Sequence, residues 1–293
     1  MRNVLFTIAI FVLCASAAFA GGGYVPGHLT QVSNHQSPVG FFPSVDPAGG
    51  FWATQSGKMV HLSDSGVVDK VTNMSGKHPT AFGGNMAYYA NDDPSILSSG
   101  GIYQPVQGWI GQPLSPIVIG SSVYFSSSKG IILWSDGAGY DFQIRFNADW
   151  WLNELAYGGG KLIAVAQNIY DPVYDGYHTF TVDLQHKSVT EIPAMRGYQR
   201  VAASGDTFLF TDFTNTHTRR YDMVNGQLIW REDLHDPTTV TLSVGGMAAN
   251  GRFALQGFAG NLYEYRVVPE PGSLLVLGAG MLGLAGGYRL RRK

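Results

Sequence analysis

The middle of the chain repeats one pattern, in which short runs of β-branched and aromatic residues are separated by Gly, Asn, Asp and Ser. No long stretch has the 3.6-residue apolar period of an amphipathic helix, so the runs predict strands. The clearest group contains four of them, at residues 154–160, 161–167, 177–183 and 188–192. Such groups recur roughly every 30–45 residues, which is the period of propeller blades. The pattern therefore predicts an all-β repeat fold.

We count six units, which begin near Val39, Pro79, Ser115, Glu154, Gln199 and Thr241. The units open with runs of small residues, which suit an innermost strand crowded around a central axis. The last unit offers three runs only, at 246–250, 252–256 and 261–267. A missing fourth strand would leave an open edge, and residues 28–33 are placed to fill it. We therefore predict a six-bladed β-propeller closed by an N-terminal strand, with a seven-bladed ring or a β-sandwich as alternatives.

The first twenty residues have the order of a secretory signal peptide. Arg2 precedes an apolar run at residues 4–13, and the small residues around Ala20 form an A-x-A cleavage site. We expect cleavage before Gly21. The single cysteine, Cys14, lies inside this segment, so the mature chain can form no disulfide and burial must stabilise it.

The last twenty-five residues combine three elements: Pro269-Glu270-Pro271, an apolar stretch at 274–288, and a basic end. The basic residues are Arg289, Arg291, Arg292 and Lys293. The prolines disfavour helix, so the first element should be an extended, accessible strip. The apolar stretch predicts a transmembrane helix of roughly 22 Å, short of the roughly 30 Å hydrocarbon core, so the basic side chains would snorkel.

These elements in this order resemble the sorting tail of the bacterial PEP-CTERM proteins, which are substrates of exosortase-type membrane enzymes. The resemblance implies an exported chain that passes through an inner-membrane intermediate, is processed, and reaches the cell surface or the extracellular matrix. It also implies that the host bacterium makes extracellular polysaccharide. The positive-inside rule is consistent with export, because it places the basic end in the cytoplasm and the residues before Pro269 on the far side of the membrane. An ordinary C-terminal anchor is the alternative.

We therefore divide the chain into a signal peptide (1–20), an extracellular body (21–268) and a sorting tail (269–293), with residues 267–271 as a short linker. Five of the 19 basic residues and one of the 21 acidic residues lie in the signal peptide and tail. The body keeps 14 basic and 20 acidic residues, a formal charge of −6. This charge argues against nucleic acid or anionic membrane as a partner of the body.

Motifs for catalysis are scarce. The histidines have no metal-ligand spacing, and neither a G-x-S-x-G elbow nor a phosphate-binding loop occurs.

Two acidic segments place hard oxygen ligands close together, which suits Ca²⁺. Their residues are Asn91, Asp92 and Asp93 in one segment and Asp171 and Asp175 in the other. Turn chemistry accounts for both segments equally well, and we expect no other cofactor.

Trp150 and Trp151 are the best candidates for ligand binding. Neighbours on a strand point to opposite faces, so both seldom reach the same core, and an exposed ring can stack on a sugar. We therefore expect a non-enzymatic surface or matrix protein that binds a glycan, such as exopolysaccharide, or an envelope protein. The alternatives are a hydrolase or lyase with a site in the propeller channel, and a membrane-tethered periplasmic scaffold that retains its tail.

Overall fold

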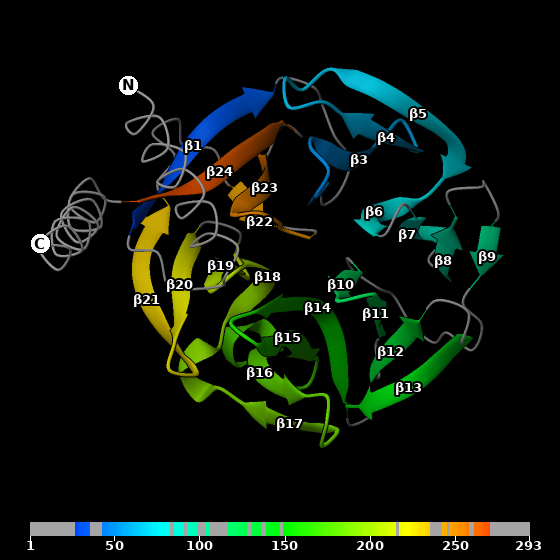
Figure 1. Ribbon diagram of the computed structural model, residues 1–293. Helices are drawn as coiled ribbons and strands as arrows, with labels where there is room; N and C mark the ends of the chain where they lie inside the picture. The colour runs from blue at the N-terminus through cyan, green and yellow to red at the C-terminus, as the bar shows by residue number, and fades with distance from the viewer. Residues whose placement is uncertain are drawn as a thin grey trace, which may run out of the picture.

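Six four-stranded antiparallel sheets form a closed ring in the computed structural model (Figure 1). The structure describes residues 27–35, 43–82, 85–90, 93–98, 103–105, 116–127, 130–135, 139–146, 149–214, 217–234, 242–244, 247–257 and 261–269. The prediction of a six-bladed β-propeller is confirmed. The expected signal peptide (residues 1–20) and residues 270–293 lie outside the described residues.

The blades follow one another along the chain. Blade one contains β2 (Ser44–Val45), β3 (Phe51–Gln55), β4 (Lys58–Leu62) and β5 (Val68–Ser75). Blade two contains β6 (Lys77–Phe82), β7 (Asn85–Ala90), β8 (Asp93–Leu97) and β9 (Tyr103–Pro105). Blade three contains β10 (Ile117–Ile119), β11 (Ser122–Ser127), β12 (Gly130–Ser135) and β13 (Gly139–Arg145).

Blade four contains β14 (Trp150–Gly158), β15 (Lys161–Asn168), β16 (Tyr177–Asp183) and β17 (Ser188–Glu191), with the 3₁₀ turns η1 (Val173–Gly176) and η2 (Pro193–Met195) in its connections. Blade five contains β18 (Tyr198–Ser204), β19 (Thr207–Asp212), β20 (Thr218–Val224) and β21 (Gln227–Leu234). Blade six contains β22 (Leu242–Val244), β23 (Arg252–Gly257) and β24 (Leu262–Pro269), and β1 (Gly27–His35) is its outermost strand.

One strand of blade six differs from our prediction. We expected its first strand at residues 246–250, but the ladder with β23 is formed by Leu242–Val244. Within the expected range, Ala249 forms an isolated bridge with Arg252. The reason is that Asn250 and Gly251 both adopt positive φ, at 54° and 72°. They form an Asn-Gly hairpin turn into β23, so Asn250 belongs to the turn.

The N-terminal strand closes the ring, as predicted. β1 pairs antiparallel with β24 from Gly27 opposite Pro269 to His35 opposite Leu262, with an irregularity between Gln31 and Ser33. Our expected linker at residues 267–271 is therefore wrong in its first part, because β24 continues through Pro269. Within the described residues no helix is long and apolar enough to cross a membrane, and the transmembrane helix expected at 274–288 lies outside them.

The hydrophobic core is divided among the interfaces between blades. Each of the six neighbouring pairs of blades shares its own cluster of buried side chains. Phe82 and Tyr89 of blade two, for example, pack with Phe125 of blade three. A single blade therefore has no core of its own, and its apolar faces are covered only when both neighbours are in place.

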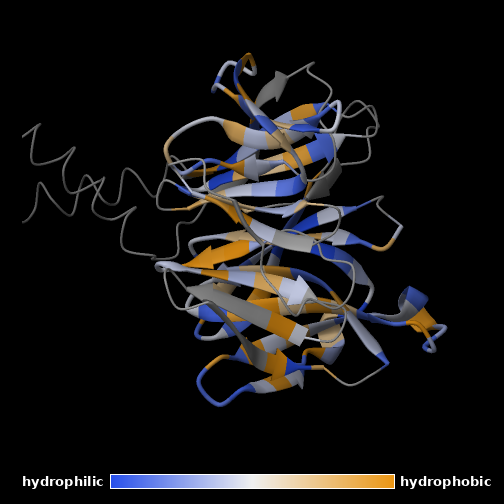
Figure 2. Cartoon of the chain, turned by 90° about the vertical axis from the view of Figure 1, so that its right-hand side faces the viewer, coloured by the Kyte–Doolittle hydropathy of each residue, from blue (hydrophilic) through white to orange (hydrophobic). Residues whose placement is uncertain are grey.

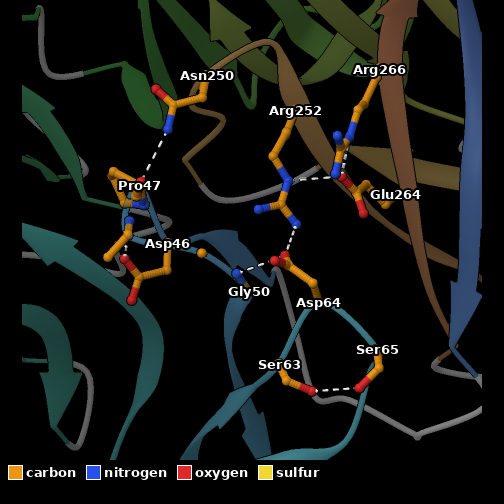
Figure 3. Close-up of polar contacts among 12 residues, drawn as sticks. Asp46, Pro47, Gly50, Ser63, Asp64, Ser65, Asn250, Arg252, Glu264 and Arg266 are labelled. Carbon is orange, nitrogen blue, oxygen red and sulfur yellow. Dashed lines mark hydrogen bonds and ion pairs between the residues drawn. The ribbon is translucent and has the colours of Figure 1, made fainter.

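Polar contacts hold blade six to blade one (Figure 3). The Val45 N–H donates to the Met247 carbonyl oxygen at 2.8 Å, and the Asn250 side chain donates to the Pro47 carbonyl oxygen at 3.0 Å. Arg252 spans the junction, because its Nη2 lies 2.6 Å from Asp64 Oδ1 and its Nε lies 2.7 Å from Glu264 Oε1. The Gly50 N–H and the Arg252 guanidinium hold the pKa of Asp64 below its usual value.

Arg252 and Arg266 offer a matched comparison, because both pair with Glu264 but only Arg252 also reaches blade one. We expect Arg252→Ala to lower the free energy of unfolding by about 2 kcal/mol, since buried Glu264 loses a charged donor and the junction loses a contact. Arg266 is half exposed, so Arg266→Ala should cost less than about 1 kcal/mol. Chemical denaturation measures both, and equal losses would contradict a special role for the junction.

Candidate binding surface on the fourth blade

The connection between β15 and β16 carries a group of exposed apolar side chains. Ile169, Tyr170, Val173 and Tyr174 are 50%, 74%, 52% and 51% exposed. Figure 2 shows a connection with a short helical turn projecting from the lower part of the ring. We call residues 169–176 the aromatic loop. Trp151, 46% exposed, lies at the same end of the blade, because it pairs with Gln167 at the end of β15.

Hydrogen bonds to both ends of the aromatic loop fix its backbone. The Asn168 side chain accepts from the Tyr170 N–H at 3.0 Å, and Asp171 Oδ1 accepts from the Val173 N–H at 2.8 Å. Gln167 Nε2 donates to the Asp175 carbonyl oxygen at 2.9 Å. These contacts hold the loop in one conformation although most of its side chains face solvent.

The last three residues of the loop have left-handed backbone conformations. Tyr174, Asp175 and Gly176 have φ of 55°, 52° and 74°. Two of them are not glycine, so this backbone is strained and must be held by its surroundings. Gly176 is required for a second reason, because a Cβ there would collide with the carbonyl oxygen of Asn168. The Tyr174 ring lies against Gly197, whose Cβ would be 3.2 Å from Tyr174 Cδ1.

A histidine at the start of β16 joins the loop to the blade. His178 is 4% exposed, and its Nε2 lies 2.9 Å from Asp171 Oδ2 in the aromatic loop. Its Nδ1 lies 2.7 Å from Glu191 Oε1 on β17, and Arg196 Nε donates to the same Glu191 oxygen at 2.7 Å. Both ring nitrogens therefore face a carboxylate oxygen. The series Asp171, His178, Glu191 and Arg196 connects the aromatic loop to β17 and to the connection that follows it.

The charges in this series stabilise one another. The Val173 N–H, and then His178, hold the pKa of Asp171 below its usual value. The Arg196 guanidinium, and then His178, lower the pKa of Glu191, and Glu191 raises the pKa of Arg196. Each carboxylate is thus favoured in its ionised form at neutral pH, where it can accept these hydrogen bonds.

The two tryptophans named from the sequence have different surroundings. The Trp150 ring packs edge-on against His178 at 4.7 Å between centroids and against Phe180 at 5.1 Å. The Trp150 ring therefore packs beside the buried His178 imidazole and helps to hold it in position. Trp151 points to the other side of the sheet and is partly exposed. Of the pair, Trp151 alone is accessible enough for a ligand, and its binding role stays a prediction.

The calcium predictions have no further support. Asp171 already accepts from the Val173 N–H and contacts His178, so its oxygens are in use. Asp93 begins β8, whereas Asn91 and Asp92 lie outside the described residues. Among the residues that the structure describes, no group of three or more His, Cys, Asp or Glu side chains is placed to hold a metal ion. Calcium stays an untested prediction.

A cleft lies on the other face of the ring, between blades three and four. Its volume is about 390 Å³. Ile119 forms the blade-three wall, and blade four contributes Tyr157, Lys161, Asp183 and Thr190. The β14–β15 and β16–β17 hairpin ends meet there, opposite the end of the blade that bears the aromatic loop. The cleft and the aromatic loop lie on opposite faces of the ring, so binding at one can be distinguished from binding at the other.

A comparison with known families concerns the end of the chain. Residues 267–293 match the PEP-CTERM protein-sorting motif. The chain ends in a PEP-CTERM sorting motif. The resemblance inferred from Pro269, Glu270, Pro271 and the basic end is therefore confirmed, and the motif marks an exported protein that is sorted to the cell surface and processed by an exosortase. No curated protein sequence matches the chain.

Solved structures match the propeller body. A gluconolactonase from Xanthomonas campestris, XC5397, is similar with a TM-score of 0.57 at 12% identity, over 83% of this chain and 90% of its own. The β-propeller domain of Cps50 (Swd1) from Myceliophteria thermophila has a TM-score of 0.54 at 11% identity, over 82% and 100%. A chain of the nidogen/laminin complex has a TM-score of 0.52 at 11% identity, over 67% and 80%. At such identities the likeness establishes the fold alone.

Gly176 and Gly160 allow a controlled test of the loop backbone. Both have positive φ, but a Cβ on Gly160 meets nothing within 4 Å. Gly160→Ala should lower the free energy of unfolding by about 1 kcal/mol through backbone strain alone. Gly176→Ala adds the collision with Asn168 and should lower it by about 3 kcal/mol, as measured by chemical denaturation. Equal effects would mean that the loop is not anchored at this point.

Acid should release the aromatic loop. The folded-state pKa values of Asp171 and Glu191 are lowered, so their stabilisation is complete above their ordinary values of roughly 4. It is lost as the pH falls below 4 through the folded values. Amide hydrogen exchange in residues 169–176, corrected for intrinsic rates, should therefore accelerate between pH 6 and pH 3. A His178→Gln variant should exchange faster already at pH 6, and unchanged wild-type protection at pH 3 would contradict this account.

Proposed function

We propose that the mature protein is a non-enzymatic component of the cell surface or extracellular matrix that binds a polysaccharide through the aromatic loop and Trp151. The observation that carries this proposal is the exposure of Tyr170, Tyr174 and Trp151 on a backbone that side-chain hydrogen bonds hold rigid. The proposal that the chain passes through an inner-membrane intermediate rests on the apolar residues 274–288.

The aromatic loop lies on the face of the ring opposite the C-terminal tail, where a ligand can reach it. Equivalent strands of a propeller run in the same direction, and β16 and β24 are each the third strand of their blades. β16 begins next to the aromatic loop, so β24 ends at Pro269 on the opposite face of the ring. A chain tethered by its C-terminal tail would therefore carry the loop on the face directed away from the tether. After processing, the same loop stays accessible.

The chemistry of the loop favours a sugar polymer as the ligand. Aromatic rings present a flat apolar face and, in tyrosine, a hydroxyl edge, which match the apolar faces and hydroxyl groups of a pyranose. Because the loop is already rigid, it loses little conformational entropy on binding. A polysaccharide that makes only a few contacts through each sugar unit can therefore still bind. The formal charge of −6 on the body favours a neutral polysaccharide over a strongly anionic one.

Affinity electrophoresis of residues 21–271 with exopolysaccharide from the producing cells tests the proposal. This segment contains every strand of the ring. Tyr170→Ala, Tyr174→Ala and Trp151→Ala should each weaken binding about fivefold, corresponding to roughly 1 kcal/mol per ring. Trp230→Ala is the matched control, because Trp230 is 55% exposed on β21 of blade five and should not matter.

Other outcomes separate the alternatives. Loss of binding in Tyr157→Ala but not in the loop variants would move the site to the cleft between blades three and four. Binding to an envelope protein fraction but to no polysaccharide would overturn the choice of ligand. Release of soluble sugar from the polysaccharide would overturn the non-enzymatic assignment and favour the hydrolase or lyase. An intact C-terminus on the native protein would favour the tethered scaffold.

A further inference from the structure

The aromatic loop contains two aspartates with different surroundings. Asp171 Oδ1 accepts from the Val173 N–H at 2.8 Å, and its Oδ2 lies 2.9 Å from His178 Nε2. Asp175 is exposed, and among the described residues its carboxylate accepts no hydrogen bond and forms no ion pair. Its main-chain carbonyl oxygen accepts from Gln167 Nε2, which fixes the backbone. The Asp175 carboxylate is therefore held at the surface and is available to a ligand.

Exposed aromatic rings accompany this carboxylate in the loop. Tyr174 directly precedes Asp175 in the chain, and Tyr174 and Tyr170 are 51% and 74% exposed. The negative face of an aromatic ring attracts a cation, and a carboxylate accepts a charge-assisted hydrogen bond from an ammonium group. A surface that combines tyrosine rings with an available carboxylate therefore suits a ligand that carries ammonium groups.

The charges around the loop have a negative balance. The loop and the series that anchors it contain three carboxylates, Asp171, Asp175 and Glu191, and one guanidinium, Arg196. The balance is two negative charges when His178 is neutral, and one when both of its ring nitrogens are protonated. Arg196 Nε donates to Glu191 at 2.7 Å, so that carboxylate offsets its charge. The field at the loop therefore repels an anionic group and attracts a cationic one.

We propose that the polysaccharide bound by the aromatic loop carries free amino groups, which Asp175 recognises in their ammonium form. This inference rests on the proposed function, because it names the chemical class of ligand at the same site. Tyr170 and Tyr174 stack on the sugar rings, and the Asp175 carboxylate accepts a hydrogen bond from an amino sugar. A neutral sugar lacks this charge and an N-acetylated amino sugar has lost it, so Asp175 selects deacetylated units.

Three β-1,4-linked hexasaccharides test the inference: the glucosamine hexamer, the N-acetylglucosamine hexamer and cellohexaose. They share one backbone and differ at C2, which bears an amine, an acetamide or a hydroxyl. Calorimetry with the full chain in a sugar-free detergent, at roughly pH 6 so that the amine is protonated, compares their affinities. The glucosamine hexamer should bind about fivefold more tightly than either of the others. Equal affinity for the three, or no binding of the glucosamine hexamer, overturns the inference.

An Asp175→Asn variant separates recognition of the charge from the structure of the loop. It preserves the size of the side chain, and asparagine tolerates the positive φ of this position. We expect affinity for the glucosamine hexamer to fall about fivefold and affinity for the other two hexasaccharides to stay unchanged.

An Asp69→Asn variant is the matched control for net charge. Asp69 lies at the start of β5, which, like β17, is the fourth strand of its blade and begins on the opposite face of the ring. The variant removes the same charge, at a side chain that is 48% exposed, and should bind all three hexasaccharides as the wild type does.

The two proposals fail separately. If the wild type binds the three hexasaccharides equally and Tyr170→Ala weakens all three, the polysaccharide site stands and selection of ammonium groups is overturned. Equal losses for the three in Asp175→Asn would show that Asp175 supports the loop without recognising the amine. An equal effect of Asp69→Asn would show that net charge alone attracts the ligand. Either of these results overturns the inference.

Discussion

Antiparallel pairing between β1 and β24 is the interaction on which the rest of the molecule depends. The chain enters the ring at Gly27 and leaves it at Pro269, and these two residues face each other in the same ladder. Because the apolar clusters lie between blades, each of them requires both of its blades, and loss of blade six would expose the clusters that it shares with blades five and one. Arg252 adds a charged contact across the junction of blades six and one. Closure therefore couples residues at the two ends of the sequence to the whole core.

Most of the fold follows from local sequence patterns. The strands of blades four and five were predictable because their apolar runs are long and their turns contain Gly, Asn or Asp at positions of positive φ, such as Asn225 and Gly226. The closing strand was predictable because three runs in the last unit imply an open edge. The first strand of blade six was misplaced because Asn250 and Gly251 form a turn, a signal that the sequence contained and we assigned to a strand. The end of β24 was missed because Pro269 suggests a break, although a proline is compatible with the end of a strand.

The candidate site was harder to predict than the fold. Trp150 and Trp151 were identified from their adjacency, but only the structure shows that Trp150 packs on His178 while Trp151 is accessible. Tyr170 and Tyr174 were passed over in a segment assigned to calcium or turn chemistry. Two tyrosines in one connection, each directly followed by an aspartate, are a usable signal of an exposed aromatic surface. The hydrogen bonds from His178 to residues far along the chain, such as Glu191, are set by strand register, which no local pattern specifies.

The two faces of the ring carry different elements. One face carries the ends of the body and hence the sorting tail, and the other carries the aromatic loop. Hydrogen–deuterium exchange of the body with and without exopolysaccharide tests this division most directly. We predict that the polysaccharide slows exchange in residues 169–176 and leaves the β14–β15 and β16–β17 hairpin ends of the opposite face unchanged. Protection confined to those hairpin ends, or no protection in the aromatic loop when binding is saturated, would contradict the account.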